Sequence, residues 1–116
     1  MWTIITTDVF DQWFDAQNDH DRAKVLASMI VLKDQGPKLK RPHADSIKGS
    51  RFQNMKELRV QSKGDPIRAF FAFDPKRQGV LLCAGHKTKH DKRFYDLMIH
   101  IADKEFASHL DRLNQR

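Results

Sequence analysis

The sequence of 116 residues lacks most features of a secreted or membrane protein. Its single cysteine, Cys83, cannot form a disulfide within the chain, which suits the reducing cytoplasm. No stretch approaches the roughly 18 apolar residues of a membrane helix, and the start of the chain has neither the basic nor the apolar segment of a signal peptide. We therefore expect a cytoplasmic protein with no membrane segment.

Several catalytic arrangements are missing as well. The sequence has no glycine-rich phosphate loop and no recognisable serine–histidine–aspartate arrangement. Cys83 lies inside an apolar run, so we expect a buried and unreactive side chain. His86 and His90 have a metal-like spacing, but they span an expected strand-to-helix junction without an evident third ligand. We expect neither a metal nor another cofactor.

Positive charge is what the sequence has in excess. There are 21 Lys and Arg residues against 15 Asp and Glu residues, which gives a net charge of +6. The basic residues concentrate between residues 33 and 56 and between 87 and 93, whereas residues 8–21 contain aspartates but no lysine or arginine. Such a field attracts nucleic acid first, although a solvated basic surface or an acidic protein partner would also explain it. The two basic blocks could converge into one site.

The hydrophobic pattern predicts one α+β domain over residues 1–116, an antiparallel sheet packed with helices in the order β-α-α-β-β-β-α. Residues 37–53 are polar and contain proline and glycine, which favours a loop. Short turns between the last three strands indicate an antiparallel meander. The expected helices begin near residues 8, 19 and 91, and the expected strands cover 2–6, 54–60, 67–73 and 80–86.

Symmetric hairpin turns would bring three cations together on one face of this sheet. A symmetric first turn puts Arg59 opposite Arg68, and facing residues share a face. A symmetric second turn, with Phe73 paired to Val80, puts Lys87 on the same face. These side chains would form a cationic patch across three strands.

The patch has two interpretations. Glu57 shares the strand face of Arg59, so the carboxylate and the arginines could form a structural ion pair. Alternatively, three cations against one carboxylate leave a surplus of positive charge, which favours a site for a phosphate. In that case Lys87, with its pKa lowered by the neighbouring arginines, could act as a base, and Glu57 is the rival base.

Three segments carry a more specific signal: MKELRV at 55–60, IRAFFAFDP at 67–75 and LLCAGHKT at 81–88. They resemble the core strands of the RelE superfamily of toxins, in particular its phage-derived HigB-like branch, and the resemblance covers nearly the whole chain. It implies the toxin of a type II toxin–antitoxin pair, an endoribonuclease that cleaves messenger RNA, typically on the ribosome. It also implies a helix-turn-helix antitoxin as partner. A noncatalytic nucleic-acid-binding module or an inactive relative is the alternative.

The resemblance also implies roles for individual residues. Arg59 and Arg68 match the basic strand positions of the family's active site, and Lys87 matches the basic residue that closes the last strand. Tyr95 lies near the position where several relatives carry a C-terminal aromatic residue. Together with Glu57 these are the candidate catalytic residues. Further basic residues are expected to bind RNA: Lys56, Lys89, Lys92 and Arg93.

Overall fold

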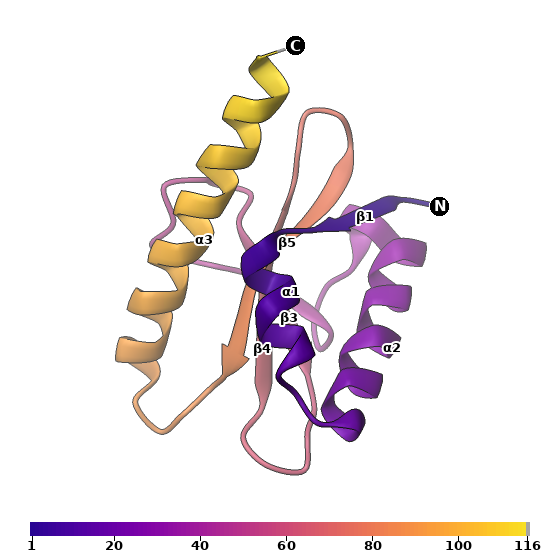
Figure 1. Cartoon of the computed structure of the whole chain (residues 1–116), viewed down its shortest axis with the longest axis vertical. Helices are drawn as coiled ribbons and strands as arrows, with labels where there is room; N and C mark the ends of the chain where they lie inside the picture. The colour runs from indigo at the N-terminus through magenta and orange to yellow at the C-terminus, as the bar shows by residue number, and fades with distance from the viewer. Residues whose placement is uncertain (116) are drawn as a thin grey trace.

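One mixed sheet separates two hydrophobic layers in the structure, a computed structural model that describes residues 1–115 (Figure 1). Helices α1 and α2 cover one face of the sheet and α3 covers the other. The strand order is β1-β5-β4-β3-β2. In chain order the elements are β1 (Thr3–Thr6), α1 (Asp8–Asp15), α2 (Asp19–Gln35), a 3-10 turn η1 (Gly36–Lys38), β2 (Ala44–Ser46), β3 (Lys56–Val60), β4 (Ile67–Phe73), β5 (Gln78–His86) and α3 (Asp91–Asn114).

The predicted α+β class is confirmed, and the predicted order of elements roughly matches. Two features were not predicted. The segment expected to be a loop contains the short edge strand β2, which pairs with β3. β1 runs parallel to β5, so the sheet is mixed rather than wholly antiparallel. Both features depend on pairing partners far along the chain, which a local hydrophobic pattern does not report.

Two cores form because the side chains of the central strand β4 alternate between the faces of the sheet. Phe71 packs with α1 and α2, whereas Phe70 packs with α3, and both rings are almost fully buried. Gly36 ends α2 with a φ of 61°, and the Trp2 ring lies so close that a Cβ would come within 2.1 Å of its indole nitrogen. Both the backbone conformation and the lack of space for a Cβ therefore require glycine at the end of this helix.

A β-bulge sets the register between β4 and β5. Near the turn Phe73 pairs with Gly79, not with Val80 as a symmetric turn predicts. The register then shifts between Phe70 and Phe71, so that Arg68 lies opposite Gly85. Because one extra residue of β5 is absorbed at the bulge, the error at the turn is cancelled before it reaches the arginine.

The Thr7 side chain forms hydrogen bonds with both this bulge and the first helix. Its hydroxyl donates to the carbonyl of Leu82, the extra residue, at 2.6 Å and accepts from the amide of Phe10 at 3.1 Å. Thr7 is therefore the N-cap of α1. The same side chain therefore caps the N-terminus of α1 and hydrogen-bonds the carbonyl of the bulged residue in β5.

A buried Asp–His pair joins the β4–β5 turn to α3. The carboxylate of Asp74 accepts from the backbone amides of Lys76 and Gln78 at 2.9 Å each, and His109 of α3 lies 2.7 Å from its second oxygen. Burial alone would raise the pKa of the Asp74 carboxyl, but the hydrogen bonds from His109 and Gln78 outweigh it and lower the pKa. Asp74 thus ties the β4–β5 turn to the C-terminal half of α3.

No helix within residues 1–115 is long and apolar enough to cross a membrane.

Replacing Asp74 should destabilise the fold and change its response to acid. We expect Asp74→Asn to lower the free energy of unfolding by about 2–3 kcal/mol at neutral pH, because buried donors lose their acceptor. The native pKa lies below the unfolded value of about 3.9, so this stabilisation exists above that value and is lost as the pH falls through the native pKa. Urea unfolding at several pH values measures both effects, with the exposed Asp111→Asn as control. Equal stability of Asp74→Asn and wild type at pH 7 would contradict this prediction.

Candidate active site

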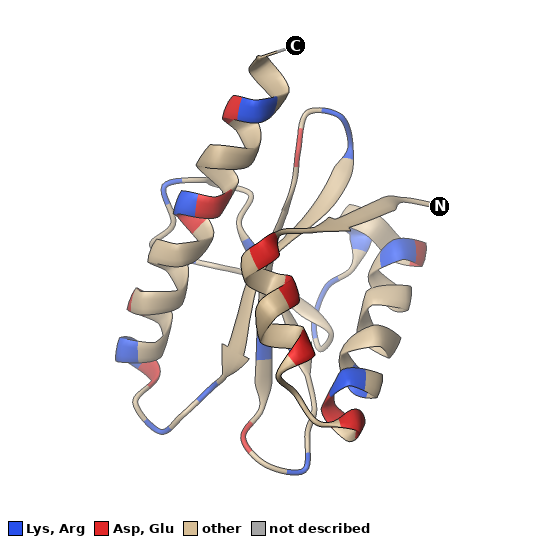
Figure 2. Ribbon diagram, in the orientation of Figure 1, with Lys and Arg blue, Asp and Glu red and all other residues tan. Residues whose placement is uncertain are grey.

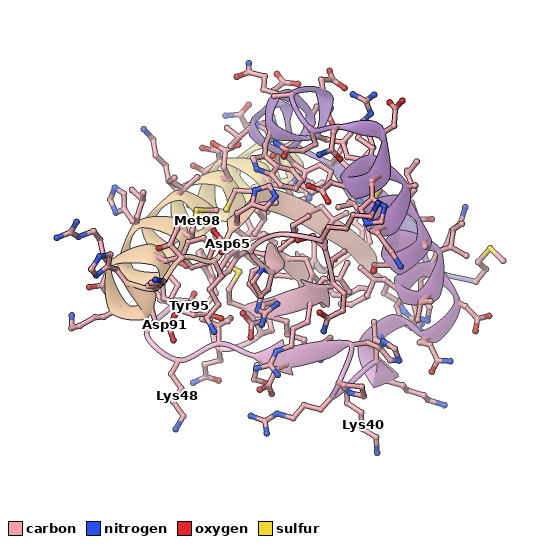
Figure 3. The ribbon with its side chains drawn as sticks, turned by 90° about the horizontal axis from the view of Figure 1, so that it is seen from below. Lys40, Lys48, Asp65, Asp91, Tyr95 and Met98 are labelled. Carbon is pink, nitrogen blue, oxygen red and sulfur yellow. The ribbon has the colours of Figure 1, made fainter. Side chains whose placement is uncertain are left out.

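Four of the five predicted catalytic residues meet on the face of the sheet that α3 covers. Glu57 and Arg59 lie on β3, Arg68 lies opposite Arg59 on β4, and Tyr95 comes from the first turns of α3. Figure 3 shows Tyr95 on the side of α3 that faces the sheet. The alternation of β3 and the pairing of Arg59 with Arg68 produce this arrangement, as the symmetric first turn predicts.

Glu57 is the centre of the cluster, although it is only 3% exposed. One carboxylate oxygen accepts the Tyr95 hydroxyl at 2.6 Å, and the other accepts the Nε of Arg59 at 3.1 Å. The Nε of Arg68 lies 3.7 Å from the oxygen that Tyr95 contacts. Burying a carboxylate costs several kcal/mol unless opposite charges and hydrogen bonds compensate, and here both are present.

The guanidinium of Arg68 has unused hydrogen-bonding capacity. Its side chain is 13% exposed, and its Nη1 donates to the carbonyl of Ile67 at 3.1 Å. Its Nε is buried and has no hydrogen-bond partner among residues 1–115. A buried donor without a partner is uncommon in folded proteins and often marks a functional group. Arg59 is more accessible, with 32% of its side chain exposed.

Tyr95 is held in its protonated form. Burial raises the pKa of its hydroxyl to about 12, and the adjacent Glu57 carboxylate acts in the same direction, whereas Arg68 opposes the shift. At neutral pH the phenol is therefore a hydrogen-bond donor that orients Glu57. The ring packs edge-on against Phe70 at 5.9 Å between centroids, which fixes its position over the sheet.

The charge balance of the site differs from the expected surplus of cations. Asp45 of β2 lies 3.5 Å from Arg59, and Asp91 at the start of α3 lies 3.6 Å from Lys87. Each of the three cations therefore has a carboxylate nearby. The argument from three cations against one carboxylate was wrong, because the sequence pattern did not reveal that Asp45 and Asp91 reach the site.

Lys87 lies at the margin of the cluster. It follows the last residue of β5, its amide donates to the carbonyl of Pro66 at 2.7 Å, and its ammonium group pairs with Asp91. The contacts do not show the expected crowding of this lysine by the two arginines, so they give no support to its role as a base. The Lys87 side chain is 27% exposed.

The residues expected to bind RNA separate into two locations. Lys92 and Arg93 are exposed on the first turn of α3, after the exposed Lys89, and Lys92 pairs with Asp96 at 2.9 Å. Lys56 is not with them, because alternation along β3 turns it to the opposite face from Glu57. Its ammonium group contacts the carbonyl of Pro37 at 3.2 Å. The two basic blocks, residues 33–56 and 87–93, converge only in part. Lys48 of the first block and Lys92 of the second line one groove beside Tyr95.

The remaining nucleophiles and histidines lie outside the cluster. Burial raises the pKa of the Cys83 thiol to about 12, as expected for an unreactive core residue. His86 lies on the face covered by α1 and α2, 3.2 Å from the buried carboxylate of Asp21 and beside the Trp13 ring. Within the described residues, no group of three or more potential ligands could hold a metal ion.

Comparisons with known proteins agree with the geometry. A family model described as phage-derived protein Gp49-like matches residues 12–107. HigB2 of Mycobacterium tuberculosis is 42% identical over 99 residues, covering 84% of this chain and 49% of HigB2, so the chain spans about half of that protein. HigB3 of the same organism is 44% identical over 101 residues, covering 87% of each chain. Both are named as toxin candidates.

Solved structures of very different sequence share the fold. The Escherichia coli toxin RelE in its free state superimposes with a TM-score of 0.60 at 6% identity, covering 80% of this chain and 90% of RelE. A chain of the RelE–RelB complex of Pyrococcus horikoshii gives a TM-score of 0.56 at 10% identity, covering 76% of this chain and 97% of that one. The chain therefore has a RelE-like fold. More particularly, the chain belongs to the family of phage-derived Gp49-like proteins, and the expected likeness to HigB proteins is confirmed.

The single tyrosine of the chain makes the cluster measurable. We expect the phenolate absorbance to titrate with a midpoint of about 12, because burial and Glu57 oppose ionisation of Tyr95. In Glu57→Gln the midpoint should fall toward the ordinary value of about 10, since the negative charge is removed. Circular dichroism over the same pH range must show that the fold persists. A midpoint near 10 in the folded wild type would disprove the contact between Tyr95 and Glu57.

Proposed function

We propose that this chain is the toxin of a type II toxin–antitoxin pair, an endoribonuclease that cleaves messenger RNA on the ribosome without a metal ion. The observation that carries the proposal is the meeting of Glu57, Tyr95, Arg59 and Arg68 on one face of the sheet. A polar cluster of this kind, partly buried and with an unpartnered guanidinium nitrogen, is more typical of an active site than of a core. The names of the two curated relatives point in the same direction.

The reaction would use the ribose 2′-hydroxyl as nucleophile on the adjacent phosphorus. The 2′-oxygen loses its proton and bonds to phosphorus, while the bond from phosphorus to the 5′-oxygen breaks and that oxygen gains a proton. The products are a 2′,3′-cyclic phosphate and a free 5′-hydroxyl. Such a site must accept one proton, deliver another and stabilise the added negative charge on the phosphate.

The arginines suit the last of these tasks. Their planar donors fit phosphate oxygens bidentately, and both side chains retain donors beyond those that bind Glu57. An entering phosphate would compete with Glu57 for Arg59, the more exposed of the two. That exchange would release the carboxylate oxygen that Arg59 occupies, and we assign Glu57 as the acceptor of the 2′-hydroxyl proton. Tyr95 keeps the carboxylate oriented during the exchange.

Lys87 is assigned to the leaving group. Its ammonium group is partly exposed at the edge of the cluster and its pairing with Asp91 keeps it close to the start of α3. In this position it can give a proton to the departing 5′-oxygen. Lys89, Lys92 and Arg93 follow on an exposed segment, where they would contact the RNA backbone.

The proposed partner is an antitoxin with a helix-turn-helix domain. One solved relative of this fold, RelE of Pyrococcus horikoshii, was crystallised in complex with RelB. An antitoxin would also be attracted by the net charge of +6 if its toxin-binding segment is acidic.

A noncatalytic nucleic-acid-binding module is the second candidate. It is favoured by the contacts of Glu57, because Arg59 and Tyr95 occupy both oxygens of the proposed base. In such a module Glu57 would serve only to organise the arginines.

Expression without an antitoxin separates the two candidates. We expect induction of the wild type to arrest growth and to shorten the half-lives of translated messages. Arg59→Ala should remove toxicity, because loss of a pre-oriented charged donor costs on the order of 100-fold in rate. The exposed Arg112→Ala makes the same charge change and should remain toxic. Melting curves must show that both variants fold. Full toxicity of Arg59→Ala, or unchanged growth with the wild type, would disprove the catalytic role.

The chemistry of the cut is a separate prediction. Cleavage by purified protein with translating ribosomes should continue after transition metals are chelated, while ribosomal magnesium is left in place. The products should end in a 2′,3′-cyclic phosphate and a 5′-hydroxyl, and a message with a 2′-deoxy sugar at the cut site should resist. Mass spectrometry of the fragments identifies the ends. Cutting of the deoxy message, or 3′-hydroxyl ends, would exclude the internal 2′-hydroxyl as nucleophile.

A further inference from the structure

A second basic pocket lies beside the cluster, on the edge formed by η1 and β2. The pocket has a volume of about 450 Å³, and its lining includes Lys38, Lys40, Arg41 and Lys56. Among residues 1–115, the only carboxylate in the lining is that of Asp45, so the described part of this concave surface holds four cations and one anion. Lys40 and Lys48 project from this same side of the molecule (Figure 3), and Figure 2 shows the basic residues of the chain segment around η1.

Asp45, the carboxylate in the described lining of the pocket, already contacts two arginines. Asp45 accepts the Nε of Arg41 at 2.8 Å and lies 3.5 Å from Arg59 of the cluster. The hydrogen bond from Arg41 is the main cause that holds the pKa of Asp45 below its ordinary value. Lys38 and Lys40 are exposed and have no carboxylate partner within residues 1–115. The repulsion between these cations would be relieved by an anion in the pocket.

Lysines next to an edge strand, such as Lys38 and Lys40 before β2, also have a purely structural explanation. They discourage pairing with another sheet, and β2 is an edge of this one. That explanation requires charge along the edge but no concavity. It does not account for Lys56, which comes from the neighbouring strand β3 and points into the same pocket.

We propose that this pocket is a second phosphate site, which binds an RNA phosphodiester away from the point of cleavage. The inference rests on the proposal that the chain acts on RNA. Asp45 lines the pocket and contacts Arg59, whereas Lys56 faces away from Glu57, so an RNA strand that occupied both sites would pass around the edge strand β2. Lysines bind phosphate as point charges without reading the base, which suits a contact to the backbone. The phosphate belongs either to the message or to ribosomal RNA.

The test uses a probe that cannot be cleaved, so that binding is measured whether or not the chain is an enzyme. A single-stranded oligonucleotide with 2′-O-methyl sugars is one probe, and purified bacterial ribosomes are the other. Lys38→Ala/Lys40→Ala should weaken binding by roughly tenfold and reduce the slope of log K against log salt by about 0.7, the contribution of one phosphate contact on a single strand. Lys76→Ala/Lys104→Ala removes the same charge at exposed positions elsewhere and should bind like the wild type.

The outcomes divide as follows. A loss with both probes assigns the phosphate to the message, whereas a loss with ribosomes alone assigns it to ribosomal RNA, and either supports the site. Equal binding by the two double variants with both probes overturns it. A polyglutamate peptide serves as a third probe, for a protein partner. If the pocket variant loses binding to this peptide while its binding to both RNA probes is unaffected, the phosphate site is overturned and a protein partner is indicated. If the wild type proves nontoxic but the pocket variant still loses RNA binding, the second site stands while the catalytic proposal fails.

Discussion

The candidate site depends on one buried carboxylate. Glu57 is 3% exposed and must be compensated, and the compensation comes from three different elements: Arg59 on its own strand, Arg68 on β4 and Tyr95 on α3. Because each partner compensates part of the buried charge, these elements are constrained relative to one another. The geometry that would bind a phosphate is therefore maintained by the same contacts that stabilise the fold.

The rest of the sheet supports that cluster indirectly. The bulge in β5 corrects the register before Arg68, and Thr7 satisfies the carbonyl of the extra residue Leu82. At the opposite end, Asp74 and His109 hold α3 to the β4–β5 turn. With one end of α3 fixed by this pair and the other by Tyr95, the helix is attached to the sheet at both ends, and the polar contacts at each end are largely shielded from water.

Charge has two different distributions in this molecule. Around Glu57 the cations are balanced by carboxylates, whereas in the pocket at η1 and β2 they are not. A balanced cluster can release an arginine to a phosphate without a large change in the local field, and an unbalanced pocket attracts the polyanion from a distance. In the two proposals, the pocket at η1 and β2 would attract the RNA and the cluster around Glu57 would cleave it.

The local sequence determined the fold class, the central hairpin and the pairing of Arg59 with Arg68. Those features follow from alternation, continuous apolar runs and short turns, and all of these are readable within a dozen residues. Tertiary structure alone decided that Asp45 enters the site and that β1 runs parallel to β5. Each depends on segments that meet across the fold, and an exposed charge carries no periodic signal of its partner. The sequence thus determined which residues could serve the site, and the packing of distant segments decided how their charges are balanced.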